Sequence, residues 1–125
     1  MKLRIHGNSI RLRLSQSEVT EFQIEGRINS RLELSGEAFE YSLITDPAAN
    51  AVAAKMNGLS LTVCVPSEAA ERWSSTNEVG LSREQDLGDG KSLKILIEKD
   101  FTCLVPRQGD EDADTFPHPK AAGAR

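Results

Sequence analysis

Two short runs near the N-terminus alternate apolar with basic residues and enclose a Gly-Asn pair. The runs are residues 3–5 and 10–14, and the pair is Gly7-Asn8. A period of two predicts half-buried β-strands. A Gly-Asn pair between such strands predicts a tight hairpin, because both residues tolerate a positive φ angle. Centring the turn on this pair sets the register and brings apolar residues together on one face, with Ile5 opposite Ile10 and Leu3 opposite Leu12.

The second of these strands ends at Leu14 and leads into a predicted helix. Ser15-Gln16-Ser17-Glu18 has the form of a capping box. In this motif the Ser hydroxyl accepts a hydrogen bond from the backbone N–H three residues on, and the Glu side chain accepts one from the N–H of the cap. We predict a helix to residue 24 or 25, with Val19 and Phe22 toward the core. Gly26 is suited to the left-handed conformation that ends many helices.

Further alternating runs fill the rest of the first hundred residues. Alternation predicts strands over residues 27–34, 39–43, 59–65 and 93–97, with weaker candidates over 52–56 and 79–81. Asn57-Gly58 predicts a second hairpin turn, and a short helix is expected over residues 66–74. We interpret the polar segment 84–90 as a loop. The nearly continuous apolar run 93–97 predicts a strand in the centre of its sheet.

Together these elements predict a mainly β (α+β) fold. Six to eight strands would form a strongly curved sheet or a small barrel with two short helices, and an open α+β sheet with both helices on one face is the alternative. The order of strand and helix at residues 10–18 recurs at residues 61–68. This recurrence predicts an internal repeat of two ββα units. Coincidence is the competing interpretation, because a strand followed by a capped helix is a common arrangement.

Length and composition are those of a single globular domain. The 125 residues are 38% hydrophobic and 27% charged, which is typical of such domains. We expect the domain to span residues 1–105, followed by an acidic, proline-containing flexible tail over residues 106–125. The formal net charge of −4 argues against binding of nucleic acid through bulk charge.

No segment of the sequence indicates export or insertion into a membrane. The first residues lack the apolar stretch of a signal peptide, and no segment approaches the about 20 apolar residues of a transmembrane helix. Without an export signal, Cys64 and Cys103 are expected to be reduced thiols. The expected location is therefore the cytoplasm.

The predicted hairpin carries like charges opposite one another on its polar face. Arg4 lies opposite Arg11 and Lys2 opposite Arg13, and each such pair costs about 0.2–1 kcal/mol. One hypothesis is an anion site, in which these cations hold a phosphate, a carboxylate or an acidic partner. The ligand-binding residues assigned to it are Arg4, Arg11, Arg13 and Lys94. The other hypothesis is that the protein neutralises the face with its own acidic residues, namely Glu33, Glu98 or the run 110–114.

The residues that could carry catalysis or bind a metal form no recognisable motif. Cys103 and His6 could in principle make a nucleophilic pair, but most such cysteines are packing residues. The acidic run 110–114 with His118 lacks the glycine and the terminal glutamate of a calcium loop. Residues 84–90 lack the spacing of a phosphate-binding loop. We therefore expect no catalytic residue, no metal and no cofactor.

Two segments of the sequence resemble a family of small uncharacterised bacterial proteins. They are RIHGNSIRLRLSQSE, from Arg4 to Glu18, and LKILIEKDFTCL, from Leu93 to Leu104. The resemblance extends over nearly the whole chain and implies a bacterial, cytoplasmic origin. It brings no activity and no site residues, because no function is assigned to that family.

Two functions are compatible with these observations. The favoured one is a noncatalytic binding or interaction module that uses the basic hairpin face for a small anionic ligand or an acidic protein partner. The alternative is a small enzyme that acts on a phosphate- or carboxylate-bearing substrate, with the arginines as clamps and Glu18, Glu98 or Cys103 near the chemistry. The enzyme requires a concave site where these groups converge. Pairing of a sheet edge with a second copy of the chain, as a homo-oligomer, is a third hypothesis.

Overall fold

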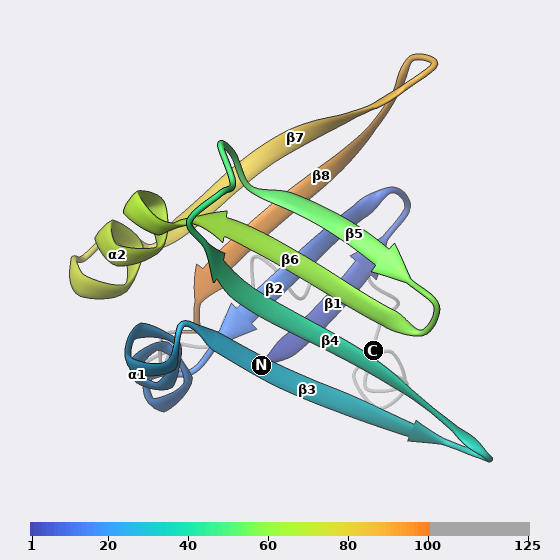
Figure 1. Ribbon diagram of the computed structural model, residues 1–125, viewed down its shortest axis with the longest axis horizontal. Helices are drawn as coiled ribbons and strands as arrows, with labels where there is room; N and C mark the ends of the chain where they lie inside the picture. The colour runs from blue at the N-terminus through green and yellow to red at the C-terminus, as the bar shows by residue number, and fades with distance from the viewer. Residues whose placement is uncertain (101–125) are drawn as a thin grey trace, which may run out of the picture.

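The computed structural model describes residues 1–100, which form eight strands and two helices (Figure 1). The elements in chain order are β1 (Lys2–His6), β2 (Ser9–Leu14), α1 (Gln16–Glu25), β3 (Arg27–Leu34), β4 (Glu37–Asp46), β5 (Ala53–Asn57), β6 (Ser60–Pro66), α2 (Ser67–Ser75), β7 (Gly80–Gly88) and β8 (Lys91–Lys99). The predicted mainly β fold with two short helices is confirmed. The predicted tail over residues 106–125, and the domain boundary before it, lie outside the described residues.

The eight strands are divided equally between two sheets. The strand order is β1-β2-β8-β7 in the first sheet and β3-β4-β6-β5 in the second. Each sheet has a parallel pair at its centre, β2 with β8 and β4 with β6, and antiparallel pairs on either side. The central position predicted for the run 93–97 is confirmed, since β8 has a neighbour on each side. No closed barrel is found in the described part of the chain.

The N-terminal hairpin and the helix that follows it form as the sequence predicts. β1 and β2 pair in the predicted register, with His6 opposite Ser9 next to the two-residue turn. The Ser15 hydroxyl accepts a hydrogen bond from the Glu18 N–H at 3.3 Å, and the Glu18 carboxylate accepts one from the Ser15 N–H at 2.8 Å. Gly26 ends α1 in the left-handed conformation, with φ of 76°. Local signals therefore determine this part of the fold.

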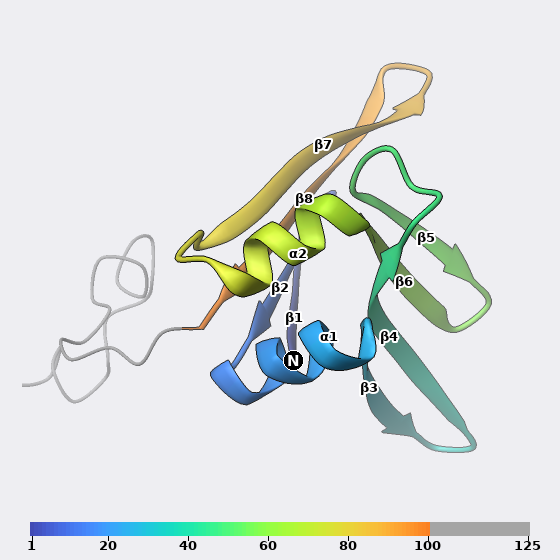
Figure 2. The same cartoon turned by 60° about the vertical axis from the view of Figure 1, so that its left-hand side comes forward.

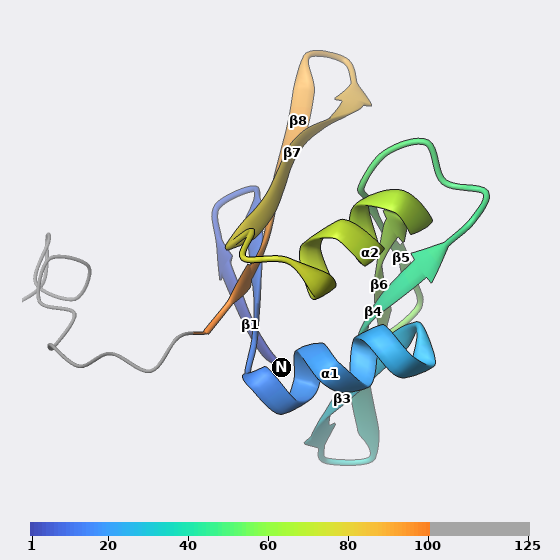
Figure 3. The ribbon, with the colours of Figure 1, turned by 90° about the vertical axis from the view of Figure 1, so that its left-hand side faces the viewer.

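The core lies between the two sheets and is closed at one end by the helices (Figures 2 and 3). Each helix contacts strands of both sheets. Phe22 of α1 and Trp73 of α2 are fully buried and meet edge to face, with their ring centroids 6.1 Å apart. The Trp73 Nε1–H donates a hydrogen bond to the Val79 carbonyl at 3.0 Å. The helices thus seal one end of a two-sheet structure and do not cover one face of an open sheet.

Two details of the sequence-based assignment are wrong. The predicted loop 84–90 is mostly strand, because β7 runs to Gly88 and only Asp89-Gly90 makes the turn, both with positive φ. In that strand Arg83 and Gln85 reach the second sheet, while Glu84 is exposed, so no apolar alternation marks it. The second hairpin turn also lies one residue later than predicted. Its register pairs Asn57 with Ser60, which leaves Gly58-Leu59 as the turn.

Candidate functional site: a basic face on the first sheet

The outer side of the first sheet carries most of the cations singled out from the sequence. On β2, Ile10, Leu12 and Leu14 are buried, so the residues that alternate with them point away from the core. The pairing registers continue this side onto β1 and β8. We call the side chains on it the basic face, which consists of Lys2, Arg4, His6, Arg11, Arg13 and Lys94. All four residues predicted to bind a ligand belong to it.

The register also fixes which of these residues are neighbours. Arg4 lies directly opposite Arg11, which in turn lies beside Leu96 of β8. Lys94 lies beside Ser9 on one side and Glu84 of β7 on the other. A cation of β1 or β2 and a cation of β8, far apart in the sequence, are therefore one or two strands apart on the same surface.

Glu98 neutralises one edge of the basic face. The Arg13 Nε and Nη2 atoms donate to the Glu98 Oε1 atom at 2.9 and 2.6 Å. The Arg11 Nε atom lies 3.7 Å from the same oxygen. Lys2 pairs with Asp100, with Nζ and Oδ2 3.1 Å apart. Of the acidic residues proposed from the sequence to compensate the face, Glu98 does so.

The other two candidates for compensation are not found there. Glu33 belongs to the second sheet, where it pairs with Arg31 at 2.9 Å. The acidic run 110–114 lies outside the described residues. Within residues 1–100, neither Arg4 nor Lys94 makes an ion pair, and both side chains are exposed. Compensation of the basic face by described residues is therefore partial.

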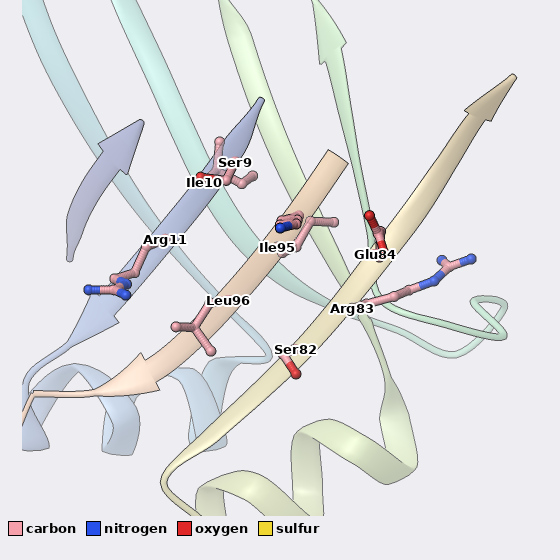
Figure 4. A pocket seen from close by; sticks show the side chains of 9 residues that line it. Ser9, Ile10, Arg11, Ser82, Arg83, Glu84, Ile95 and Leu96 are labelled. Atoms are coloured by element: carbon pink, nitrogen blue, oxygen red, sulfur yellow. The ribbon is translucent and has the colours of Figure 1, made fainter. Parts of the chain in front are cut away.

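A shallow depression of about 410 Å³ lies on the same side of the sheet (Figure 4). Leu96 provides an apolar floor between Arg11 and Ser82. Lys94, which is paired with Ser9 near the hairpin turn, also lines the depression. Arg83 projects away from β7 (Figure 4), and its Nη1 donates to the Val52 carbonyl at 2.6 Å. The depression combines two cations and two hydroxyls with one carboxylate, that of Glu84, which accepts a hydrogen bond from the Ser92 hydroxyl at 2.8 Å. The cations and hydroxyls are groups that can hydrogen-bond an anion.

Of the groups considered for catalysis, His6 and Glu98 lie on the basic face, whereas Glu18 and Cys64 belong to α1 and β6. Glu18 lies at the start of α1, where it pairs with the N-terminal amine. Burial would raise the pKa of Glu18, but hydrogen bonds from the N-terminal amine and from Ser15 lower it overall. Burial raises the pKa of the Cys64 thiol, which favours the unreactive protonated form. Cys103 lies outside the described residues, and residues 1–100 contain no cluster of three or more acidic, His or Cys side chains that could hold a metal.

Sequence reasoning named Lys94 of β8 but missed the contributions of Leu96 on β8 and Ser82 on β7. Ser82 was outside any assigned element, and Leu96 was counted only as part of a buried run. The parallel pairing of β2 with β8 brings these residues to Arg11, and the two strands are more than eighty positions apart. No alternation of hydrophobicity marks this part of β7, because its inner positions after Leu81 are Arg83 and Gln85.

Comparisons with known proteins give the chain a family but no activity. The model of a family of unknown function matches residues 1–120. No curated protein and no solved structure matches the chain significantly. Within residues 1–100, neither helix is long and apolar enough to span a membrane.

Proposed function

This chain belongs to DUF7009, a family of unknown function, and we propose that it is a noncatalytic binding module whose basic face holds an anionic ligand or an acidic protein partner. The observation that carries the proposal is a pair of exposed cations, Arg4 and Lys94, that form no ion pair with any of residues 1–100. Glu84 lies beside Lys94 in the register of β7 and β8 but does not pair with it. The two cations stand out in a chain with a formal net charge of −4. Such a chain has an excess of carboxylates with which to compensate a purely structural cation.

The different contacts of Arg11 and Arg13 with Glu98 support the same proposal. Arg13 is held by two hydrogen bonds to Glu98, so we assign it a structural role beside the site. Arg11 makes no hydrogen bond to that carboxylate, because its Nε atom is 3.7 Å from the Oε1 atom. It can therefore turn toward a ligand in the neighbouring depression. We therefore narrow the ligand-binding set to Arg4, Arg11 and Lys94, with Arg13 as the residue that orients Glu98.

The enzyme alternative receives no support from the described residues. It requires a general acid, base or nucleophile beside the arginines in a concave site. On this face Glu98 is engaged with Arg13, and Glu84 accepts a hydrogen bond from the Ser92 hydroxyl. Glu18 is engaged at the start of α1. An open surface with cations and hydroxyls is better suited to holding an anion than to transforming one.

Charge reversal tests the proposal. We expect the wild type to bind one or more of inorganic phosphate, nucleotides, dicarboxylates and a short oligoglutamate peptide, as measured by calorimetry. Arg4→Glu combined with Lys94→Glu should lower that affinity at least tenfold, because each charge-assisted hydrogen bond contributes about 1.5–3 kcal/mol.

The matched control is the double variant Arg27→Glu with Lys55→Glu on the second sheet. It changes the net charge equally at two exposed positions, so it separates the site from bulk charge. If it weakens binding as much as the basic-face variant does, or if the wild type binds none of these anions, the proposal is wrong.

We also infer that the two halves of the chain derive from one repeated unit. Both halves have the order strand, strand, helix, strand, strand. Several structurally matching residues are separated by the same 51 positions, including Gly7 and Gly58 in the turns and Phe22 and Trp73 in the core. The first hairpin of each half pairs with the second hairpin of the other half: β1–β2 joins β7–β8, and β5–β6 joins β3–β4. This exchange supports a duplication in which the two copies complete each other's sheets.

A further inference from the structure

The strand orders place β1 and β7 at the edges of the first sheet and β3 and β5 at the edges of the second, and side chains of β7 bridge to the β5 edge. Between β5 and β7, the Arg83 guanidinium donates to the Val52 carbonyl at 2.6 Å. The Gln85 side chain accepts from the Ala54 N–H at 2.8 Å and donates to the Ala54 carbonyl at 3.4 Å. The outward backbone groups of Ala54 on the β5 edge are therefore satisfied by β7.

The corresponding pair of edges, β1 and β3, has no such bridge. At the fourth and sixth positions of the strand, where β7 has Arg83 and Gln85, β3 has Ser30 and Leu32. Neither side chain makes a hydrogen bond to β1, and no hydrogen bond of any kind joins β1 to β3 within residues 1–100. Among the described residues, the β1 edge therefore has no hydrogen-bonded neighbour of the kind that the β5 edge has in β7.

The hairpin register shows which backbone groups of β1 face this edge. In a two-residue hairpin the pair next to the turn is hydrogen-bonded, and hydrogen-bonded pairs then alternate along the strands. His6 and Arg4 therefore bond to β2, while the N–H and C=O groups of Leu3 and Ile5 point outward. Ala54 holds the place in its own hairpin that Leu3 holds here, and its backbone groups do point outward to Gln85.

The side chains of β1 alternate between the inner and the outer face of the first sheet. On the inner side of the sheet, Ile5 is 63% exposed. On the outer side, Arg4 has no ion-pair partner among the described residues. A strand added to β1 would place alternate side chains on these two faces. Its inner residues would need to be apolar and its outer residues acidic.

We propose that β1 accepts an extended segment of a partner protein in which acidic residues alternate with apolar ones. The backbone of the segment pairs with Leu3 and Ile5, its carboxylates approach Arg4, and its apolar side chains cover Ile5. This inference rests on the proposed function of the basic face, and it specifies the acidic partner as a β-strand. The same strand would cover an exposed sheet edge, which proteins rarely leave bare.

The test uses the full chain and a capped heptapeptide of alternating Val and Glu. We expect the peptide to bind and to slow hydrogen exchange at the Leu3 and Ile5 amides, which exchange fast in the free protein, while Arg4 is protected in both states. Ile5→Pro should lower the affinity at least tenfold, because it removes an outward N–H without removing a bond to β2. The matched control, Met56→Pro, alters the corresponding exposed position of β5 and should leave the affinity unchanged.

A second peptide, N-methylated on alternate amides, separates strand pairing from charge. If it binds as tightly as the parent, or if Ile5→Pro binds normally while Arg4→Glu with Lys94→Glu does not, the strand proposal fails and the proposed function stands. If neither the peptide nor any simple anion binds, both fail.

Protection of the Leu3 and Ile5 amides in the free protein at every concentration would assign the edge to another segment of this chain. Protection that grows with concentration would assign it to a second copy, and either result overturns the proposal.

Discussion

The Glu98 carboxylate controls how much positive charge the basic face offers. It accepts two hydrogen bonds from Arg13 and lies 3.7 Å from Arg11. Replacing it with glutamine should free Arg11 for a ligand, so Glu98→Gln should raise the affinity for anions several-fold. The same change should lower the free energy of unfolding by about 1–2 kcal/mol, because charge-assisted bonds in a partly exposed pair are lost. Calorimetric titration and urea denaturation measure the two effects, and a fall in affinity would contradict the account.

Ionisation of Glu18, in the first turn of α1, makes the stability of the fold depend on pH. The pKa of Glu18 is lowered in the folded state from a reference of 4.5, so folding favours its ionised form. The stabilisation is complete above pH 4.5 and is lost as the pH falls through the lower folded pKa. Glu18→Gln keeps the capping hydrogen bond but removes the charge. Urea denaturation should show the variant less stable than the wild type near neutral pH, with the difference shrinking below pH 4.5; a constant difference would be the contrary result.

At the scale of elements, the two hairpin turns offer a comparison within one molecule. Gly7 and Gly58 have φ angles of 56° and 61°, and a Cβ atom at either would contact nothing within 4 Å. The cost of Gly→Ala is then set by backbone conformation alone, at about 1–2 kcal/mol. We predict that Gly7→Ala and Gly58→Ala lower the free energy of unfolding in urea by equal amounts. A difference larger than about 1 kcal/mol would contradict the equivalence of the two halves.

Elements that depend on residues close together in the sequence are the ones that could be predicted from it. The β1–β2 hairpin, the cap at Ser15 and the end of α1 at Gly26 depend on residues within a few positions of one another, and all three were predicted. β7 was partly missed because it is an edge strand whose inner positions are polar. Arg83 and Gln85 face the second sheet to bond with its backbone, so the pattern of hydrophobicity that identifies a strand is absent there.

At the scale of the whole molecule, the division into two sheets could not be predicted from local patterns. It depends on two parallel pairings between distant segments, β2 with β8 and β4 with β6. The pairing of β2 with β8 also assembles the site, because it brings Lys94 and Leu96 beside Ser9 and Arg11. The sequence therefore identified the cations of the basic face but not the depression between them, nor which acidic residue would compensate them.

Amide chemical-shift mapping of the full chain, titrated with the oligoglutamate peptide, is the most direct test that the basic face is a binding surface. We predict saturable shifts concentrated at Arg4, Arg11 and Lys94 and their neighbours on β1, β2 and β8, weakened by salt and lost in Arg4→Glu with Lys94→Glu. Shifts that are absent, that map to the second sheet, or that persist unchanged in that double variant would contradict the account.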